Sequence, residues 1–339
     1  MQSFSYASPK TTQEAVELLR QNGPQAALLA GGTDLLSLMK DSVVSPSVII
    51  NLKSIDDLSG IRVNGKNLKI GATTTLAELA SDAKVQKLFP ALTQAAEGVS
   101  SPQIRNMGTI GGDLCQRPRC WYFRKGYGLL PRHDGDSMIK AGDNRFHAIF
   151  GNAGDAQFVN PSSFAPALIA LGAEINITGP RGTRTVLLGD FYHIPSNGED
   201  EYVLAYDEGA EKEYALADDE ILVDIQIPMG ETLNATYEIR QRQVLDWPLV
   251  AAAVSLDFWD RGGEVSAASV VLGHVAPVPW VSKVAAQQLE GKIISSQVAQ
   301  QAGDAAIVEA LPLSMNKYKV QLARVAIKRA IIKAVGMES

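Results

Sequence analysis

Two glycine-rich segments constrain this chain more than any other feature of its sequence. They are residues 30–34, AGGTD, and residues 104–114, IRNMGTIGGDL. Glycine lets a backbone adopt positive φ and lets amide groups approach a ligand closely, and successive exposed N–H groups bind anions. A helix that begins just after Gly32 would add the positive end of its dipole. The two segments therefore predict a pair of loops that hold the two phosphates of a dinucleotide from both sides.

On its own residues, the first segment allows two interpretations. Gly31-Gly32 is not part of the G-x-G-x-x-G pattern of the Rossmann dinucleotide-binding fold. A pair of glycines also occurs in ordinary turns that bind nothing. Gly31-Gly32 is therefore either a simple turn or one half of a phosphate site, and the longer second segment carries the stronger signal.

Helices and strands alternate in the part of the chain before Pro228, which is typical of an α/β layer architecture. Capping-box spacing at residues 11–14 and 75–78 predicts two helix starts, and Asp34 is expected to cap a helix over residues 35–40. The other expected elements are a buried strand over residues 26–30, strands over 48–50, 68–70 and 174–178, a helix from Pro90 that leads into a glycine-rich turn at 111–112, a long loop-like stretch over 114–148, a helix over 161–171 and a polar surface excursion over 197–213.

The pattern changes after Pro228. Three β-rich runs then have the spacing of an antiparallel meander, namely residues 235–242, 250–258 and 265–272. Over residues 280–335 alanines and other apolar residues recur with a period of 3.6, which predicts helices. We therefore predict an α+β protein with an α/β domain, residues 1–228, and a sheet-plus-helix domain, residues 229–339.

Composition excludes several classes of partner. The formal net charge is −6 and no Lys/Arg-rich run occurs, so neither nucleic acid nor an anionic membrane surface is expected as a partner. No apolar run approaches the ~20 residues that span a bilayer, and no secretory signal is expected at the N-terminus. Cys115 and Cys120 are too few for a secreted disulfide scaffold. We expect a cytoplasmic location, with export to the periplasm alongside a signal-bearing partner as the alternative.

Several segments together resemble one known family. Residues 30–34 with residues 104–112 resemble the FAD subunits of the molybdenum hydroxylases, which include the medium subunit of carbon monoxide dehydrogenase and the flavin domain of xanthine dehydrogenase. Residues 220–228, EILVDIQIP, resemble the family segment that closes the flavin domain, and residues 273–280, GHVAPVPW, resemble its C-terminal domain. Residues 115–124, CQRPRCWYFR, are similar to a loop in flavin subunits of aldehyde oxidoreductases and 4-hydroxybenzoyl-CoA reductases. The resemblance spans nearly the whole chain.

The resemblance implies both a fold and a function. The fold would be the PCMH-like FAD-binding fold, with two α/β subdomains around FAD, followed by a small antiparallel sheet with helices. The chain would be an oxidoreductase subunit that receives electrons through [2Fe–2S] clusters of a small subunit, after substrate oxidation at the molybdenum cofactor of a large subunit. It would pass them to an external acceptor, so no catalytic acid or base is expected in this chain. A stand-alone flavin oxidoreductase and a cofactor-free scaffold subunit remain as alternatives.

The resemblance also implies which residues touch FAD. Residues 30–34 and 109–112 would surround the pyrophosphate and the ribityl chain, and Leu222 would lie beside the isoalloxazine ring or its neighbouring chain. Ser162 and Ser163 match a Ser-Asp pair of the family, with Ser163 in place of the Asp. The complete set of implied cofactor-binding residues is Leu29, Ala30, Gly31, Gly32, Thr33, Asp34, Leu35, Ile104, Gly108, Thr109, Gly111, Gly112, Asp113, Ser162, Ser163 and Leu222.

Two further expectations concern single residues. Glu238 stands where relatives often carry a basic residue near the flavin, so no cation acts from that position in this chain. Because Gly111 belongs to the glycine-rich loop, replacing it by Val is expected to remove the flavin while the fold stays largely intact.

The loop over residues 114–148 contains Cys115 and Cys120 as its only cysteines. In the relatives that this loop resembles, four cysteines hold an additional [4Fe–4S] cluster, and such clusters generally use four thiolates. Gly128 and Ser137 stand about where the other two cysteines would be. Either a cluster is retained with other ligands, or the loop is kept without it; we expect an ordered loop and no metal in this subunit.

Aromatic and basic residues alternate near these cysteines. Trp121-Tyr122-Phe123 either anchors the loop in a core or forms an interface patch, because aromatic residues and arginine are enriched at interfaces. The neighbouring arginines are expected to pair with carboxylates of a partner or with an FAD phosphate; they are Arg117, Arg119 and Arg124.

Overall fold

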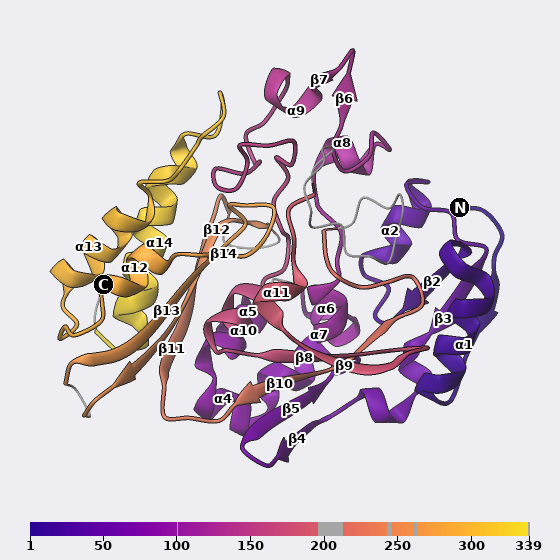
Figure 1. The fold of residues 1–339 in the computed structure, drawn as a ribbon, viewed down its shortest axis with the longest axis horizontal. Helices are drawn as coiled ribbons and strands as arrows, with labels where there is room; N and C mark the ends of the chain where they lie inside the picture. Colours follow the sequence, from indigo (N-terminus) through magenta and orange to yellow (C-terminus); the bar gives the residue numbers. More distant parts are fainter. Residues whose placement is uncertain (100, 196–212, 243–245, 261–262, 338–339) are drawn as a thin grey trace.

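The N-terminal residues form a small parallel sheet with the strand order β1-β3-β2 (Figure 1). The computed structural model describes the whole chain except residues 100, 196–212, 243–245, 261–262 and 338–339. The elements of this part are β1 Ser5–Ala7, α1 Thr12–Asn22, β2 Ala26–Leu29, α2 Leu35–Lys40 and β3 Val48–Asn51. Thr11 caps α1, because its side chain accepts a hydrogen bond from the Glu14 N–H.

The second sheet is antiparallel, and its strand order is β4-β5-β10-β8-β9. Its strands are β4 Ile61–Asn64, β5 Asn67–Gly71, β8 Glu174–Gly179, β9 Gly182–Leu187 and β10 Ile221–Pro228. The helices that accompany it are α3 Leu76–Ser81, α4 Ala83–Leu88, α5 Pro90–Gly98, α6 Pro102–Met107, α7 Ile110–Leu114, α10 Ala165–Ala170 and α11 Leu188–Phe191. Side chains from both sets form one buried core, so α7 and the segment before α10 are held on a rigid support.

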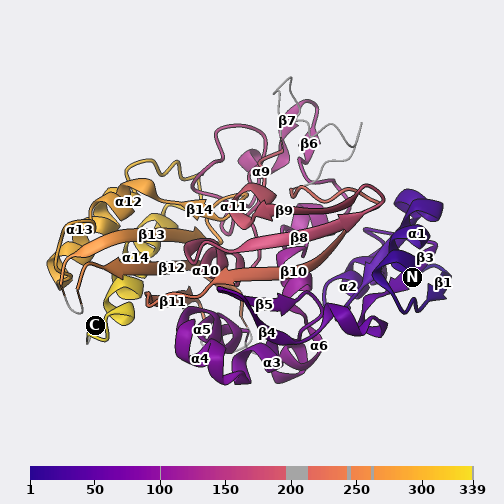
Figure 2. The same cartoon turned by 60° about the horizontal axis from the view of Figure 1, so that its bottom comes forward.

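A third sheet, with the strand order β11-β12-β13-β14, follows in the chain. Its elements are β11 Leu233–Arg240, β12 Pro248–Phe258, β13 Val265–Gly273, β14 Trp280–Val281, α12 Lys283–Gln287, α13 Ser296–Ala306 and α14 Tyr318–Ala334. Figures 1 and 2 show the last three helices on the outer side of this sheet. On the inner side α10 contacts β12 and β13, and α5 contacts β11, so the third sheet lies directly against the helices that accompany the second sheet.

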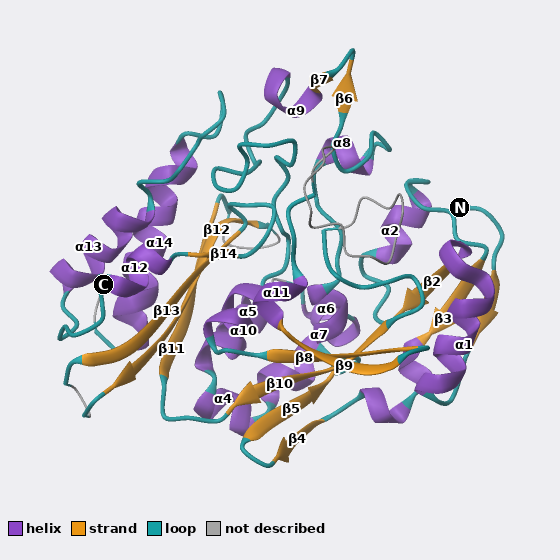
Figure 3. Cartoon of the chain, viewed as in Figure 1, coloured by secondary structure: helices purple, strands orange, loops and turns teal. Residues whose placement is uncertain are grey.

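Residues 115–158, hereafter the insertion, project from the body of the molecule (Figure 3). They contain α8 Trp121–Arg124, β6 Arg132–His133, β7 Asp136–Ser137 and α9 Met138–Ala141. A small apolar cluster fixes the base of the insertion on α2, with Phe123, Leu129 and Phe158 packed against Leu38. The insertion is therefore ordered by its own core.

A buried lysine joins the insertion to the C-terminal helices. The Lys319 ammonium donates hydrogen bonds to the carbonyl oxygens of Phe146 at 3.3 Å, His147 at 3.1 Å and His274 at 2.6 Å. Lys319 is 1% exposed, and this burial lowers its pKa to about 7. Burial, together with repulsion from Lys319, also lowers the pKa of His147 to about 4 and that of His274 to about 3. Both imidazoles are therefore neutral near pH 7.

Most elements predicted before Pro228 are confirmed, including the full capping box of Thr75 and Glu78. The β-meander after Pro228 is confirmed as β11, β12 and β13. Residues 280–281 are a short strand, β14, where a helix was predicted. The predicted strand over 26–30 is β2, but its side chains are half-buried because it lies at the sheet edge. The division of the chain at Pro228 stays a prediction.

Two predicted helices differ from those observed. The helix from Pro90 ends at Gly98, and a new helix, α6, begins after Ser101, whose side chain caps it. Gly111 and Gly112 were predicted in a turn, but they lie in α7, which Thr109 caps by accepting from the Gly112 N–H. The helix predicted over 161–171 begins only at Ala165. The polar excursion over residues 197–213 lies outside the described residues, apart from Glu213. Among the described helices, none is both long and apolar enough to cross a membrane.

Candidate functional site

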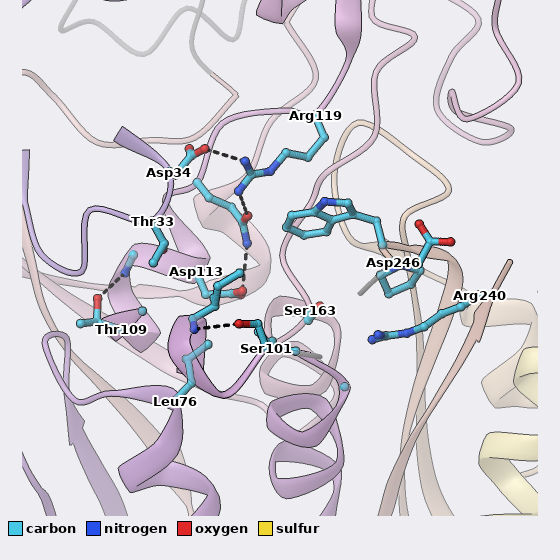
Figure 4. A pocket seen from close by; sticks show the side chains of 18 residues that line it. Thr33, Asp34, Leu76, Ser101, Thr109, Asp113, Arg119, Ser163, Arg240 and Asp246 are labelled. Carbon is cyan, nitrogen blue, oxygen red and sulfur yellow. Dashed lines mark hydrogen bonds and ion pairs between the residues drawn. The ribbon is translucent and has the colours of Figure 1, made fainter. Parts of the chain in front are cut away.

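A pocket opens where both glycine segments, the insertion and the third sheet meet (Figure 4). The residues that line it come from segments far apart in the sequence: Thr33, Asp34, Leu76, Gly98, Val99, Ser101, Ile104, Gly108, Thr109, Gly112, Asp113, Gln116, Arg119, Ser163, Arg240, Asp246, Trp247 and Pro248. Because β11 supplies Arg240 and the residue just before β12 is Trp247, the pocket needs both the N-terminal and the C-terminal parts of the chain.

The two glycine segments touch each other beside the pocket. A Cβ atom on Gly31 would collide with the carbonyl oxygen of Met107 and would lie 2.8 Å from the Gly108 Cα. Gly31 is therefore required for backbone packing between the segments. Gly32 has φ +70°, a left-handed conformation that favours glycine, and it turns the chain from β2 into α2.

Gly111 and Gly112 also have different roles, because Gly111 packs against the backbone and Gly112 faces the pocket. A Cβ on Gly111 would lie 2.8 Å from the Cβ and 2.9 Å from the carbonyl oxygen of Ala72. Among the described atoms outside its chain neighbours and its own helix backbone, a Cβ on Gly112 would meet only Thr109 Oγ1 within 4 Å, at 2.9 Å, because that side of α7 faces the pocket. These contacts argue against the expectation that Gly111→Val leaves the fold intact, and they make Gly112 the better residue for a substitution that reports on the pocket.

A chain of hydrogen bonds runs along one wall of the pocket (Figure 4). The Asp34 carboxylate pairs with the Arg119 guanidinium at 2.9 Å, and Arg119 donates to Gln116 Oε1 at 2.9 Å. Gln116 Nε2 in turn donates to Asp113 Oδ2 at 2.9 Å. The Ser162 hydroxyl donates to Asp113 Oδ1. This chain links the first glycine segment, the insertion, α7 and the segment before α10.

The Asp34 carboxylate contacts three arginine residues of the insertion instead of capping α2. Its carboxylate accepts from the Arg117 backbone N–H at 2.8 Å and pairs with Arg124 at 2.7 Å as well as with Arg119. Its side chain makes no capping hydrogen bond to α2, which corrects the predicted role. The Arg117 side chain pairs with Glu213 at 2.7 Å. The three arginines thus contact carboxylates of this chain, and their predicted pairing with a partner's carboxylates or with an FAD phosphate stays a prediction.

The opposite wall is built from the third sheet. Glu238 and Arg240 form an ion pair. Burial raises the pKa of Glu238, although Arg240 and Ser163 oppose this shift. Arg240 thus supplies a cation to the pocket two residues after Glu238. Between the walls, the indole of Trp247 lies 4.5 Å from the guanidinium of Arg119, so one cation–π contact joins the insertion to the third sheet.

The structure brings half of the predicted site residues to the pocket. Those that line it are Thr33, Asp34, Ile104, Gly108, Thr109, Gly112, Asp113 and Ser163. Those outside the lining set are Leu29, Ala30, Gly31, Gly32, Leu35, Gly111, Ser162 and Leu222. Several residues outside the lining set hold the lining residues in place. Ser162 holds Asp113, Gly31 packs against Gly108, and Leu222 is a buried core residue next to the bulge in β10.

Several lining residues were not predicted as cofactor residues. Leu76, Gly98, Val99 and Ser101 lie near the second glycine segment, where the Pro102–Met107 helix had no separate sequence signal. The sequence indicated Gln116 and Arg119 only as part of an arginine-rich loop, not as residues that line a cofactor pocket. Residues 246–248 follow a meander strand, and nothing in the local sequence indicates that they reach a site formed by residues about 130 positions earlier.

The aromatic residues of the insertion anchor it internally. Trp121 lies edge-on to Phe146 and His147 at 5.7 Å between ring centroids, and Phe123 is buried under the guanidinium groups of Arg117 and Arg124. These contacts favour the anchoring interpretation over a free interface patch for Phe123.

Both cysteines are free thiols in surroundings unlike those of cluster ligands. Burial, with Glu213 and Asp113 nearby, raises the pKa of Cys115 to about 12, which disfavours the thiolate that binds metal. Cys120 Sγ lies 3.2 Å from His147 Nε2. Among the residues that the structure describes, no three His, Cys, Asp or Glu side chains are placed to hold a metal ion.

Iron analysis of the anaerobically purified chain tests the absence of a cluster. We expect no iron and no broad thiolate-to-iron absorption, because Cys115 is held protonated and Cys120 contacts a neutral imidazole. The variant Cys120→Ser should have the same absorption spectrum as the wild-type chain. About four irons per chain would contradict the prediction, since [4Fe–4S] clusters carry that number.

The pocket is suited to a dinucleotide that carries an aromatic ring. The guanidinium groups of Arg119 and Arg240 complement a pyrophosphate, and the Trp247 indole complements a planar ring. In addition, the buried Arg119 Nε has no hydrogen-bond partner among the described residues, so a donor is left for a ligand. The fold and the pocket define a dinucleotide-binding flavoprotein.

Comparison with known proteins identifies the group within that class. The model of the FAD binding domain in molybdopterin dehydrogenase matches residues 2–230, and that of the CO dehydrogenase flavoprotein C-terminal domain matches residues 235–334. The carbon monoxide dehydrogenase medium chain of Hydrogenophaga pseudoflava is 30% identical over 97% of this chain and 96% of its own length. The aldehyde oxidoreductase FAD-binding subunit PaoB of Escherichia coli is 31% identical over 98% of this chain and 99% of its own length.

Solved structures agree with these sequence comparisons. The crystal structure of a Cu,Mo-CO dehydrogenase has a chain with a TM-score of 0.75 and 27% identity, which covers 99% of this chain and 98% of that chain. Quinoline 2-oxidoreductase from Pseudomonas putida 86 gives a TM-score of 0.73 with 26% identity over 99% of this chain and 98% of that chain. The chain belongs to the family of FAD-binding medium subunits of the molybdenum hydroxylases. The predicted family, the predicted fold and FAD as the cofactor are confirmed.

Proposed function

We propose that this chain transfers electrons within a molybdenum hydroxylase complex, from the [2Fe–2S] clusters of a small subunit to an external acceptor. The observation that supports this most is the composition of the pocket. It combines anion-binding groups with one indole and closes against the third sheet, in a chain that covers nearly all of its FAD-subunit relatives. Substrate oxidation would then belong to a molybdenum-cofactor large subunit.

The pocket residues have distinct roles in this proposal. Arg119 would bind the pyrophosphate, Trp247 would cover the ring system, and Ser162 with Gly31 would position the residues that line the pocket. Bound FAD supplies the ability to accept electrons singly and to release them in pairs. Within the described pocket wall, no His or Cys side chain is available for substrate chemistry, which favours electron transfer over substrate turnover.

The proposal extends to the organisation and the location of the chain. We propose that residues 1–228 form the FAD-binding domain in two subdomains and that residues 229–339 form the C-terminal domain that completes the pocket. Free cysteines at 115 and 120 support a cytoplasmic location, with co-export to the periplasm as the alternative.

Separating the chain from its partners tests the function. The purified chain with bound FAD should oxidise no aldehyde or purine, whereas the three-subunit complex should bleach its flavin absorbance when substrate is added. In a complex that carries Gly112→Leu, substrate should still reduce the [2Fe–2S] clusters, but reduction of the external acceptor should stop. Steady turnover by the lone chain would identify a stand-alone oxidoreductase. Unchanged acceptor reduction without FAD would identify a scaffold.

A further inference from the structure

Asp113 is the carboxyl group that lies deepest in the wall of the pocket. It is 9% exposed, lies on α7, and follows directly after the pocket-facing Gly112. Its Oδ1 accepts from the Ser162 hydroxyl and from the Phe164 N–H at 3.3 Å, while its Oδ2 accepts from Gln116 Nε2 at 2.9 Å. Three neutral donors thus hold a carboxylate in a buried position.

No cation compensates this carboxylate directly. Within the described part of the chain Asp113 forms no ion pair, and Arg119, which lies beyond Gln116, pairs with Asp34 at 2.9 Å. The groups that face Asp113 from the packed elements are Arg119, Gln116 and Cys115 of the insertion, Ser162, Ser163 and Phe164 before α10, and Tyr192 at the end of α11. Tyr192 and Cys115 are themselves kept neutral by burial, which raises the pKa of each.

The negative charge of bound FAD would raise the pKa of Asp113 further. Burial already raises the pKa of Asp113 to about 6, although the donation from Ser162 opposes this shift. FAD brings a pyrophosphate with two negative charges into the pocket that Asp113 lines, and like charges in a poorly solvated site disfavour ionisation. Since Oδ1 already accepts two hydrogen bonds and Oδ2 accepts one, Oδ2 is the oxygen available for a proton.

We propose that Asp113 takes up one proton from solvent when FAD binds, so that the chain holds FAD more tightly at lower pH. The proton adds to Oδ2 and converts the carboxylate to the neutral acid, and no bond in FAD is made or broken. This inference rests on the proposed function of the pocket as the FAD site. Besides lining the pocket, Asp113 would then control how the affinity for FAD depends on pH.

Titration of the flavin-depleted full-length chain with FAD from pH 5.5 to 8.5 tests the proposal. Quenching of flavin fluorescence gives the dissociation constant, and calorimetry in two buffers of different ionisation enthalpy counts the protons. For the wild-type chain we expect the dissociation constant to rise by up to about tenfold per pH unit above pH 6, with nearly one proton taken up. Asp113→Asn should bind FAD with a constant that does not change with pH.

Two further variants make the result specific. Ser162→Ala removes a donor that stabilises the carboxylate, so the rise of the dissociation constant should begin at a higher pH than in the wild type. Asp246→Asn removes another carboxylate that lines the pocket and should keep the wild-type dependence on pH. A wild-type chain that binds FAD with no proton uptake would overturn the inference and leave the proposed function standing. The proposal would also be overturned if the dissociation constant for FAD changed with pH in Asp113→Asn but not in Asp246→Asn. No binding of FAD by the wild-type chain would instead contradict the proposed site.

Discussion

Gly112→Leu is expected to weaken FAD binding at least about 100-fold, equivalent to roughly 2.7 kcal/mol, with a smaller loss of stability than the same substitution at Gly111. The side of α7 at Gly112 faces the pocket, and a Cβ there meets only Thr109 Oγ1 within 4 Å among the described atoms outside its chain neighbours and its own helix backbone. A leucine side chain would therefore occupy space that the cofactor needs. Leucine favours helix more than glycine does, but its Cβ would crowd Thr109 Oγ1, which caps α7, so the urea midpoint of the flavin-free chain should fall by less than in Gly111→Leu.

Gly111→Leu is the matched control, with the same change one residue earlier. Its Cβ would lie 2.8 Å from the Ala72 Cβ and 2.9 Å from the Ala72 carbonyl oxygen, which accepts the Gly111 N–H. Backbone must move to relieve this contact, so the unfolding free energy should fall by about 1–3 kcal/mol or more. Flavin absorbance and urea unfolding of both variants measure the contrast. Full flavin occupancy in Gly112→Leu would show that FAD lies elsewhere.

Lys319→Met should remove a large part of the pH dependence of stability. Lys319 has a pKa of about 7 in the folded chain, against 10.5 ordinarily. Between these values the unfolded chain binds a proton that the folded chain does not, so wild-type stability rises with pH. The cost of the buried ammonium is fully present below pH 7 and disappears as pH approaches 10.5. The wild type should therefore gain about 1.4 kcal/mol per pH unit relative to Lys319→Met across this window.

Urea unfolding of both proteins at several pH values from 6 to 9.5 measures this difference. Lys317→Met is the control, because it removes the same charge from an exposed lysine two residues away. The difference between Lys317→Met and the wild type should stay constant with pH. A constant difference for Lys319→Met as well would show that the three carbonyl oxygens around Lys319 keep it charged in the folded chain.

Local sequence signals predicted the elements that depend on local chemistry. Thr11 and Thr75 cap helices as expected, since a capping interaction spans only a few residues. The meander after Pro228 was equally predictable, because neighbouring antiparallel strands need only short connections. The errors arose where a distant contact decides the local structure. Asp34 stands at the N-cap position of α2, but its side chain makes no capping hydrogen bond because three groups of the insertion bind its carboxylate.

The sequence by itself determined the family, the cofactor and the two glycine segments, because these follow from short motifs whose residues are adjacent in the chain. It did not determine the role of each glycine. Gly31 and Gly111 are needed for backbone contacts with Met107 and Ala72, while Gly112 faces the pocket, and only the packing of distant segments separates these roles. Tertiary structure also decided that Trp247 of the C-terminal part stacks on Arg119 of the insertion and so completes the site. Such a contact depends on how the insertion packs against the C-terminal part of the chain, and no local pattern in either segment encodes it.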